Sequence, residues 1–378
     1  MRKERKLIIV RQKYTPFGGG EIFLQQAIGA IEQLGINVNI LCREWDDGET
    51  KNIIKMPIKN RFRKSRDKSF HHKACSYIKK QKNCIVQSHE RVSCCDIYRA
   101  GEGTHKEWLS QRNRKRGFIS KLLLKLSPYH RYTLYSERKL FQSKRLKKVI
   151  CNSNMVKNEI KDHFHLSDDK LEVIYNGVNQ NRFSPKLTEK YRYKFREKLK
   201  IPTNALVFLF VGSGFERKGI DALLKSFAKT EKTNWLLIVG KDNRWKKYEK
   251  LAKKMNISER VIFTGAKKNT EPFYGMSDVF ILPTLYDPFP NSLLEAMACG
   301  LPPIISNKCG GIDLIVNKKN GLISDSLDIE QISKNMMYCS DSEVRKNLGD
   351  AAQKTIQNLT YEKMSKAYEN LYNNLIHI

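Results

Sequence analysis

Two carboxylates in the second half of the chain have the spacing of a site for a phosphorylated sugar. Asp287 lies in a proline-rich loop after the apolar run 279–282, and Glu295 follows eight residues later, inside an expected helix 292–299 that Asn291 would cap. Phosphate is favoured at a helix N-terminus, and ionised carboxylates accept hydrogen bonds from sugar hydroxyls. The unit could place Glu295 on a ribose and Asp287 on a hexose. On spacing alone, an ordinary strand-to-helix turn with solvated acids remains the alternative.

Two cations occupy a glycine-framed turn earlier in the chain. Arg217 and Lys218 lie in GSGFERKG, directly after the apolar run 206–211, and no structural partner for Lys218 is evident in the sequence. A guanidinium offers a planar fork and an ammonium a point charge, so the pair suits a diphosphate. A glycine turn with two solvated cations is the alternative.

Short apolar runs that alternate with helical patterns predict an α/β protein with these elements in two domains. The length of 378 residues suits two domains of similar size. The polar and basic stretch 180–204 is expected to be the linker between residues 1–179 and residues 205–360.

The composition is that of a globular and very basic protein. The net charge is +31, and its excess is concentrated in 51–82, with 12 Lys or Arg against one acid, and in 111–148, with 13 against one. Such charge is compatible with an anionic membrane surface or with nucleic acid, but no nucleic-acid-binding motif is present. The sequence has no run of 18 apolar residues, so no membrane-spanning helix is expected. Nine scattered cysteines without a CxxC argue against a disulfide framework or zinc site and favour a reducing cytoplasm.

The motif DPFPNSLLEAMACGLP resembles the donor site of the retaining glycosyltransferases of family 4, which have the GT-B fold. The first acid of that motif is usually Glu, and here it is Asp287. The segment SHERVSCCDIYRAGEGTHKEW is similar to bacterial lipopolysaccharide-type members, with Glu102 where Asp is more usual. The resemblance implies two doubly wound, Rossmann-like α/β domains that face a cleft, with residues 361–378 crossing back to the first domain.

The resemblance also assigns roles to individual residues. The catalytic candidates are His89, facing the transferred sugar, with Arg217, Lys218 and Asp287. The donor-binding candidates are Gly18, Gly19, Gly20, Pro288, Phe289, Asn291, Ser292 and Glu295. The acceptor-binding candidates are Arg99, Glu102, His105 and Trp108. No metal site is assigned, and no cofactor is expected apart from the nucleotide-sugar donor.

The expected activity is therefore that of a retaining, metal-independent hexosyltransferase. It would move a hexose, with glucose favoured, from a UDP-sugar to a lipopolysaccharide-core or similar membrane-associated glycan. The enzyme would be cytoplasmic and peripheral at the inner face of the cytoplasmic membrane. A basic nucleic-acid-binding protein and a glycosyltransferase-like scaffold without activity remain the alternatives.

Overall fold

The computed structural model describes residues 6–14, 37–45 and 52–376. These residues form two compact units, of which the second comprises residues 176–361. The first unit comprises the chain up to Tyr175 together with the C-terminal segment from Glu362. Over the described ranges, every helix is too short or too polar to cross a bilayer.

The first unit is built on a sheet of seven described strands that pair in parallel, in the order β5-β3-β1-β6-β7-β8-β9. A separate short pair joins β2 to β4. The elements are β1 (Lys6–Val10), β2 (Lys13–Tyr14), β3 (Asn37–Cys42), β4 (Glu44–Trp45), β5 (Ile53–Lys55), α2 (Arg63–Lys79), β6 (Cys84–Ser88), β7 (Ile97–Arg99), α3 (His105–Asn113), α4 (Phe118–Leu126), α5 (Pro128–Phe141), β8 (Lys148–Cys151), α6 (Asn154–Phe164), η1 (Asp168–Lys170), β9 (Leu171–Val173) and α14 (Tyr361–Ile376).

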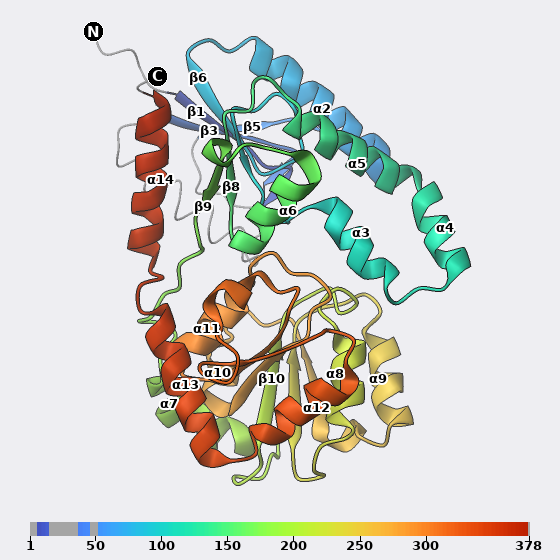
Figure 1. The fold of residues 1–378 in the computed structure, drawn as a ribbon, viewed down its shortest axis with the longest axis vertical. Helices are drawn as coiled ribbons and strands as arrows, with labels where there is room; N and C mark the ends of the chain where they lie inside the picture. The colour runs from blue at the N-terminus through green and yellow to red at the C-terminus, as the bar shows by residue number, and fades with distance from the viewer. Residues whose placement is uncertain (1–5, 15–36, 46–51, 377–378) are drawn as a thin grey trace. The chain divides into compact units, whose positions relative to one another are not determined.

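Successive side chains along each strand point to opposite faces of this sheet, and the two faces contact different helices. Val86 belongs to an apolar core that also contains Phe70 of α2 and Leu140 of α5, whereas Gln87 points to the opposite face and bonds to Tyr372 of α14. Figure 1 accordingly shows α2 and α5 on one side of the sheet and α14 on the other. The basic stretch 111–148 contains separate helices, because Gly117 precedes α4 and Pro128 opens α5.

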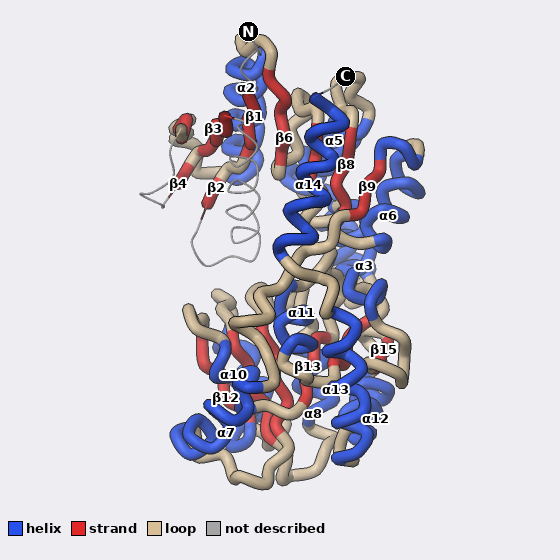
Figure 2. The backbone as a smooth tube through the Cα atoms, turned by 90° about the vertical axis from the view of Figure 1, so that its left-hand side faces the viewer, coloured by secondary structure: helices blue, strands red, loops and turns tan. Residues whose placement is uncertain are grey.

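The second unit contains a six-stranded sheet of parallel pairings, in the order β12-β11-β10-β13-β14-β15. In Figure 2 helices flank this sheet. Helix α11 contacts both β13 and α13. The elements are α7 (Lys186–Lys198), β10 (Val207–Val211), α8 (Ile220–Phe227), β11 (Trp235–Val239), α9 (Trp245–Lys254), η2 (Ser258–Arg260), β12 (Val261–Gly265), α10 (Glu271–Met276), β13 (Val279–Leu282), α11 (Asn291–Ala298), β14 (Pro303–Ser306), η3 (Gly310–Leu314), β15 (Leu322–Ser324), α12 (Ile329–Tyr338) and α13 (Ser342–Ile356).

The range 180–204, expected as a linker, contains helix α7, which packs on α10 within the second unit. Its Arg196 is fully buried and pairs with Asp278 at 2.8 Å. The guanidinium also donates to the carbonyls of Met276 and Ala205 at 2.9 and 2.8 Å. The segment is polar in composition, yet it is part of the packed structure, because one of its cations is buried and satisfies buried carbonyls.

The cysteine pattern, which argued against a disulfide framework, did not reveal one disulfide. Cys75 of α2 and Cys94, in the loop after β6, form a disulfide with their Cα atoms 5.6 Å apart. The fold brings together two positions that are 19 residues apart, which isolated cysteine spacings could not reveal. The other seven cysteines are free, so this disulfide stands alone and is not part of a framework.

Candidate active site

The strand order of the second sheet reverses between β10 and β13, which are neighbours but not consecutive. In open α/β sheets, ligands bind outside the carboxyl ends of the strands at such a point. The 212–219 turn follows β10 and the 283–290 loop follows β13. The topology therefore places the sequence-predicted cations and carboxylate at one edge of one sheet.

Direct contacts join the turn to the loop. The carbonyl of Arg217 accepts from the amide of Leu285 at 2.9 Å and from the hydroxyl of Thr284 at 2.8 Å. Gly219 has a φ of +80°, and a Cβ there would lie 1.9 Å from the carbonyl oxygen of Pro283. Only glycine permits this approach, which holds the two cations against the loop.

Lys218 has a structural partner after all, because its ammonium pairs with the carboxylate of Asp287. The Nη1 of Arg217 lies 3.4 Å from Oδ2 of the same carboxylate and donates to the carbonyl of Tyr286 at 3.0 Å. Lys218 and Asp287 are 7% and 5% exposed. Burial raises the pKa of Asp287, but the two cations outweigh it and hold that pKa below its usual range. The structure thus unites three predicted residues in one charge cluster, in which Lys218 and Asp287 are buried and Arg217 is partly exposed.

Glu295 lies in α11, which begins at Asn291 and ends before Gly300, a left-handed residue with a φ of +74°. Its carboxylate accepts from the hydroxyl of Tyr274 at 2.6 Å. Burial raises the pKa of Glu295, while Tyr274 and Arg182 oppose that rise. The remaining lone pairs of the carboxylate can accept from ligand hydroxyls.

The residues just before Glu295 differ in part from expectation. Pro290, and not Asn291, occupies the N-cap position of α11, which has no side-chain cap. The Oδ1 of Asn291 instead accepts from Nδ2 of Asn176 at 2.7 Å. Pro288 and Phe289 are buried in the loop, and Ser292 is half-buried in the first turn of the helix.

A pocket of about 570 Å³ at the same edge of the sheet was missed by sequence reasoning. It is lined by Phe215, Gly240, Lys241, Asp242, Asn243, Trp245, Phe263, Thr264, Gly265 and Ala266. Asp242 Oδ2 accepts from the amide of Phe215 at 2.7 Å, so the 212–219 turn forms part of the pocket wall. The available signal was a glycine directly after β11 and another at the end of β12.

In the first unit, His89 follows β6, and its amide donates to the carbonyl of Val10 at 3.0 Å. It therefore lies at the carboxyl ends of β1 and β6, where the order of that sheet reverses. The imidazole Nε2 is 3.0 Å from Nε2 of Gln87. Burial, Arg99 and Arg11 hold the pKa of His89 well below its usual value, so the ring is neutral at pH 7.

The four acceptor candidates fall into different surroundings. Arg99 is buried and donates to the hydroxyl of Tyr368 in α14 at 3.3 Å. Glu102 is exposed and lies 3.4 Å from Arg91 Nη1. His105 is buried at the start of α3, and Trp108 lies beneath the Arg112 guanidinium at 5.8 Å.

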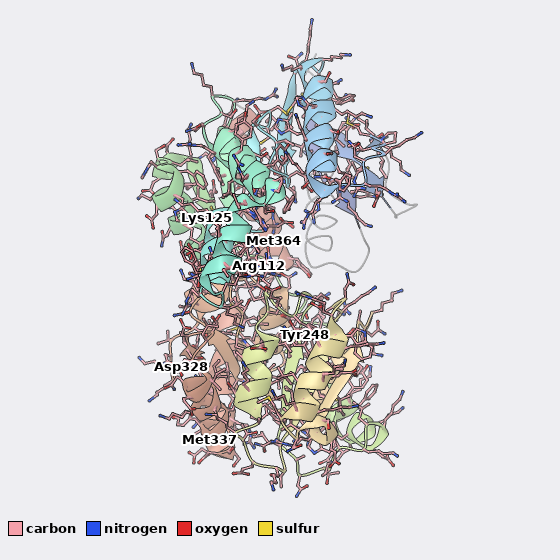
Figure 3. The ribbon with its side chains drawn as sticks, turned by 90° about the vertical axis from the view of Figure 1, so that its right-hand side faces the viewer. Arg112, Lys125, Tyr248, Asp328, Met337 and Met364 are labelled. Atoms are coloured by element: carbon pink, nitrogen blue, oxygen red, sulfur yellow. A yellow bond between two sulfur atoms is a disulfide. The ribbon has the colours of Figure 1, made fainter. Side chains whose placement is uncertain are left out.

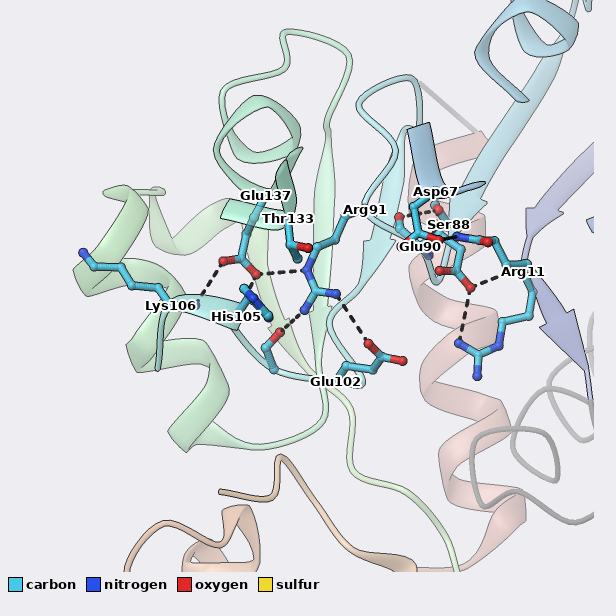
Figure 4. Close-up of polar contacts among 12 residues, drawn as sticks. Arg11, Asp67, Ser88, Glu90, Arg91, Glu102, His105, Lys106, Thr133 and Glu137 are labelled. Atoms are coloured by element: carbon cyan, nitrogen blue, oxygen red, sulfur yellow. Dashed lines mark hydrogen bonds and ion pairs between the residues drawn. The ribbon is translucent and has the colours of Figure 1, made fainter. Parts of the chain in front are cut away.

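Sequence reasoning missed the residue that organises this region. Glu137 is 1% exposed and accepts from Arg91 Nε at 3.1 Å and from the amide of His105 at 2.8 Å (Figure 4). It is the one acid in the basic stretch 111–148, which was the signal that could have found it. A buried carboxylate without such donors would be strongly unfavourable.

Gly18, Gly19 and Gly20 lie outside the described residues. Among the residues that the structure describes, no group of three or more His, Cys, Asp or Glu side chains could hold a metal ion.

Comparison with known proteins agrees with this geometry. Residues 17–182 match Glycosyltransferase Family 4, and residues 192–355 match Glycosyl transferases group 1. The chain is 23% identical over 328 residues to the lipopolysaccharide glucosyltransferase WaaG of Escherichia coli K12, covering 85% of this chain and 86% of WaaG. The crystal structure of WaaG superimposes with a TM-score of 0.83 at 22% identity, over 96% of this chain and 98% of that one. The complex of HepE from Anabaena with UDP-glucose has a TM-score of 0.73 at 16% identity, over 98% and 99%.

These matches define a glycosyltransferase with the GT-B fold, made of two Rossmann-like units. The chain belongs to the family 4 and group 1 glycosyltransferases, the first description matching the N-terminal part and the second the C-terminal part.

Proposed function

We propose that this glycosyltransferase moves a hexose, preferably glucose, from a UDP-sugar to a lipopolysaccharide-core or similar glycan, with retention of anomeric configuration and without a metal ion. The observation that carries the proposal is the Arg217–Lys218–Asp287 cluster at the reversal point of the second sheet. The name of WaaG and the UDP-glucose complex of HepE favour this donor.

The cations of this cluster would stabilise the diphosphate leaving group as negative charge develops on it. Asp287 holds Lys218 in place before the donor arrives, so the charge need not be reorganised during the reaction. Glu295 would accept from the ribose hydroxyls, and the pocket of about 570 Å³ would take the uracil. His89, in the first unit, would contribute to the transfer as a neutral ring.

Calorimetric titration with UDP tests the donor site. Saturable binding that is weakened by Lys218→Ala supports the proposal, and Lys225→Ala is the matched control, because Lys225 pairs with Asp221 on the surface of α8. A panel of nucleotide sugars then identifies the donor through release of UDP. Absence of UDP binding in a folded protein would overturn the proposal.

We also propose that the first unit rests on the inner face of the cytoplasmic membrane, with α4 as its contact. Phe118, Ile119 and Leu123 of this helix are 83%, 75% and 64% exposed, and Lys121 and Lys125 flank them. In Figure 1, α4 stands at the outer edge of its unit. Apolar residues can enter the headgroup boundary while lysines contact anionic lipids.

A further inference from the structure

A buried tyrosine holds the carboxylate of Glu295 by one of its two oxygens. The hydroxyl of Tyr274, in α10, donates to Oε2 of Glu295 at 2.6 Å. The same hydroxyl lies 3.3 Å from the carbonyl oxygen of Ser292, in the first turn of α11. Burial and the neighbouring carboxylate hold the pKa of Tyr274 well above its usual value, so the phenol keeps the proton that it donates. This hydrogen bond therefore favours the ionised form of Glu295.

The side chain of Tyr274 is fixed by its own packing. It is fully buried, and its ring packs edge-on against Phe183, with the ring centroids 5.4 Å apart. At the next residue, Gly275, a Cβ would lie 2.3 Å from the carbonyl oxygen of Leu187, so α10 lies directly against α7. Side chains in a close-packed interior keep one rotamer. The hydroxyl of Tyr274 therefore holds Glu295 in one orientation.

A cation from the segment before α7 acts on the same carboxylate. Arg182 donates to both oxygens of Glu271 at 2.7 and 3.0 Å, and its guanidinium lies 5.1 Å from the ring centre of Phe183. Bidentate contact with a carboxylate fixes the plane of a guanidinium. Burial raises the pKa of Glu295, and Tyr274 and Arg182 both oppose that rise.

The other titratable groups around Glu295 do not support its negative charge. Glu271 raises the pKa of Glu295 further through its own charge. Cys299, in the same helix, and Tyr361, at the start of α14, also lie within electrostatic reach. Burial raises the pKa of each, so both are uncharged at pH 7. Within the described residues, the ionised form of Glu295 therefore depends on the hydroxyl of Tyr274 and the charge of Arg182.

We propose that Tyr274 and Arg182 are positioning residues for the donor, which hold the carboxylate of Glu295 ionised and turned so that Oε1 accepts from the ribose hydroxyls. An ionised carboxylate accepts at both oxygens, whereas a protonated one must donate at one of them. Because Oε2 accepts from Tyr274, Oε1 is the oxygen for the ligand. The contact with ribose rests on the proposed function, whereas the control of ionisation stands on the contacts themselves.

Carbon NMR of the full-length protein, labelled at the glutamate carboxyls, measures the pKa of Glu295 without any ligand. The signal is assigned by its loss in Glu295→Gln. We expect that pKa to rise in Tyr274→Phe and in Arg182→Gln, because each variant removes a group that favours the carboxylate. Arg182→Lys keeps the charge and should stay closer to the wild type. An unchanged pKa in both Tyr274→Phe and Arg182→Gln would overturn the proposal.

Calorimetry then compares UDP with its 2′,3′-dideoxy analogue, which lacks the ribose hydroxyls. At pH 7, Tyr274→Phe should weaken the binding of UDP by about fivefold, as expected for one net hydrogen bond, and leave the binding of the analogue unchanged. The pH at which UDP binding is halved should be higher in this variant, because Glu295 takes up its proton at a higher pH. Adding Tyr274→Phe to Glu295→Gln should cause no further loss, since both changes act through one carboxylate.

Tyr248→Phe is the matched control, because it removes the hydroxyl of another buried tyrosine of the second unit, in α9 (Figure 3). Equal weakening of UDP binding in Tyr248→Phe and Tyr274→Phe would overturn the proposal. Equal weakening of UDP and of its analogue by Tyr274→Phe would do so too, because a general disturbance of the fold affects both ligands.

Failure of the proposed function gives a different result. If the wild type does not bind UDP, the donor assignment fails, and the pKa of Glu295 still decides whether Tyr274 and Arg182 control its ionisation. If Glu295→Gln weakens UDP binding and Tyr274→Phe does not, the proposed function stands and the positioning role is refuted.

Discussion

The buried pair of Lys218 and Asp287 allows stability and catalysis to be separated by a double-mutant cycle. Removing one partner of a buried ion pair costs about 3–5 kcal/mol. In Lys218→Met, Arg217 remains 3.4 Å from the carboxylate, so we expect the low end, about 3 kcal/mol. Asp287→Asn should also destabilise, because it leaves the Lys218 ammonium buried without its main partner.

In the double variant neither buried charge is left unpaired, so the unfolding free energy should return to within about 1 kcal/mol of the wild type. The rate of sugar transfer should not recover together with the stability. Loss of one preorganised charge stabiliser lowers turnover by about 10²–10³, and the double variant lacks the ammonium just as the single variant does. Stability would recover while turnover stays low.

Denaturant unfolding and steady-state release of UDP measure the two quantities on the same preparations. Lys225→Met is the control, because its pair with Asp221 is solvent-exposed and should contribute less than about 0.5 kcal/mol. Wild-type turnover in the double variant would refute the catalytic role of Lys218. Additive destabilisation, with no coupling between the two sites, would refute the structural pair.

Three other outcomes are expected. Glu295→Gln should weaken the binding of UDP, as measured by calorimetry, yet raise the unfolding free energy at pH 7 and not at pH 4. Burial raises the pKa of Glu295 in the folded state, so its ionisation costs stability as the pH rises above the unfolded pKa of about 4.3. Because the pKa of His105 is lowered to about 3, the stability present above pH 6.5 should be lost as the pH falls towards 3. His105→Gln should flatten this pH dependence of the unfolding free energy, measured by urea unfolding. Equal pH dependence in the variant and the wild type would contradict the prediction. Leu122→Gln/Leu123→Gln should reduce co-sedimentation with anionic liposomes without changing the affinity for UDP. Reversing several charges in 59–68 should also reduce co-sedimentation, in a salt-dependent way. Equal binding of the wild type to anionic and to neutral liposomes would exclude the membrane role.

Local patterns were sufficient to predict the elements that carry the candidate donor site. The run 279–282 is β13, and the helix expected at 292–299 is α11, Asn291–Ala298. Backbone preference and apolar periodicity are properties of neighbouring residues, so one sequence contains them. The carboxylate and the cations could be named as site residues for the same reason, since each lies at the end of a recognisable strand.

Contacts between distant segments could not be predicted in this way. Lys218 and Asp287 are separated by a large part of the second unit, and their pairing depends on which strands become neighbours. Arg196 appears in the sequence as one more cation of a polar stretch, although its partners are carbonyls of other segments. Burial of a charged side chain is decided by partners that no single sequence pattern encodes.

The continuity of the second unit has a consequence for the order in which the chain folds. The amide of Val178 donates to the carbonyl of Leu359 at 2.9 Å, so the unit begins and ends at one place, as an insertion into the first. The first unit completes its sheet face only with Tyr368 and Tyr372 of α14, which follows the second unit in the sequence. Domains fold as units during synthesis on the ribosome. We therefore expect the second unit to reach its native state first, because the first unit remains incomplete until α14 has been synthesised. A chain that ends at residue 361 should show protease resistance in the second unit and cleavage in the first, and equal resistance in both would contradict this order.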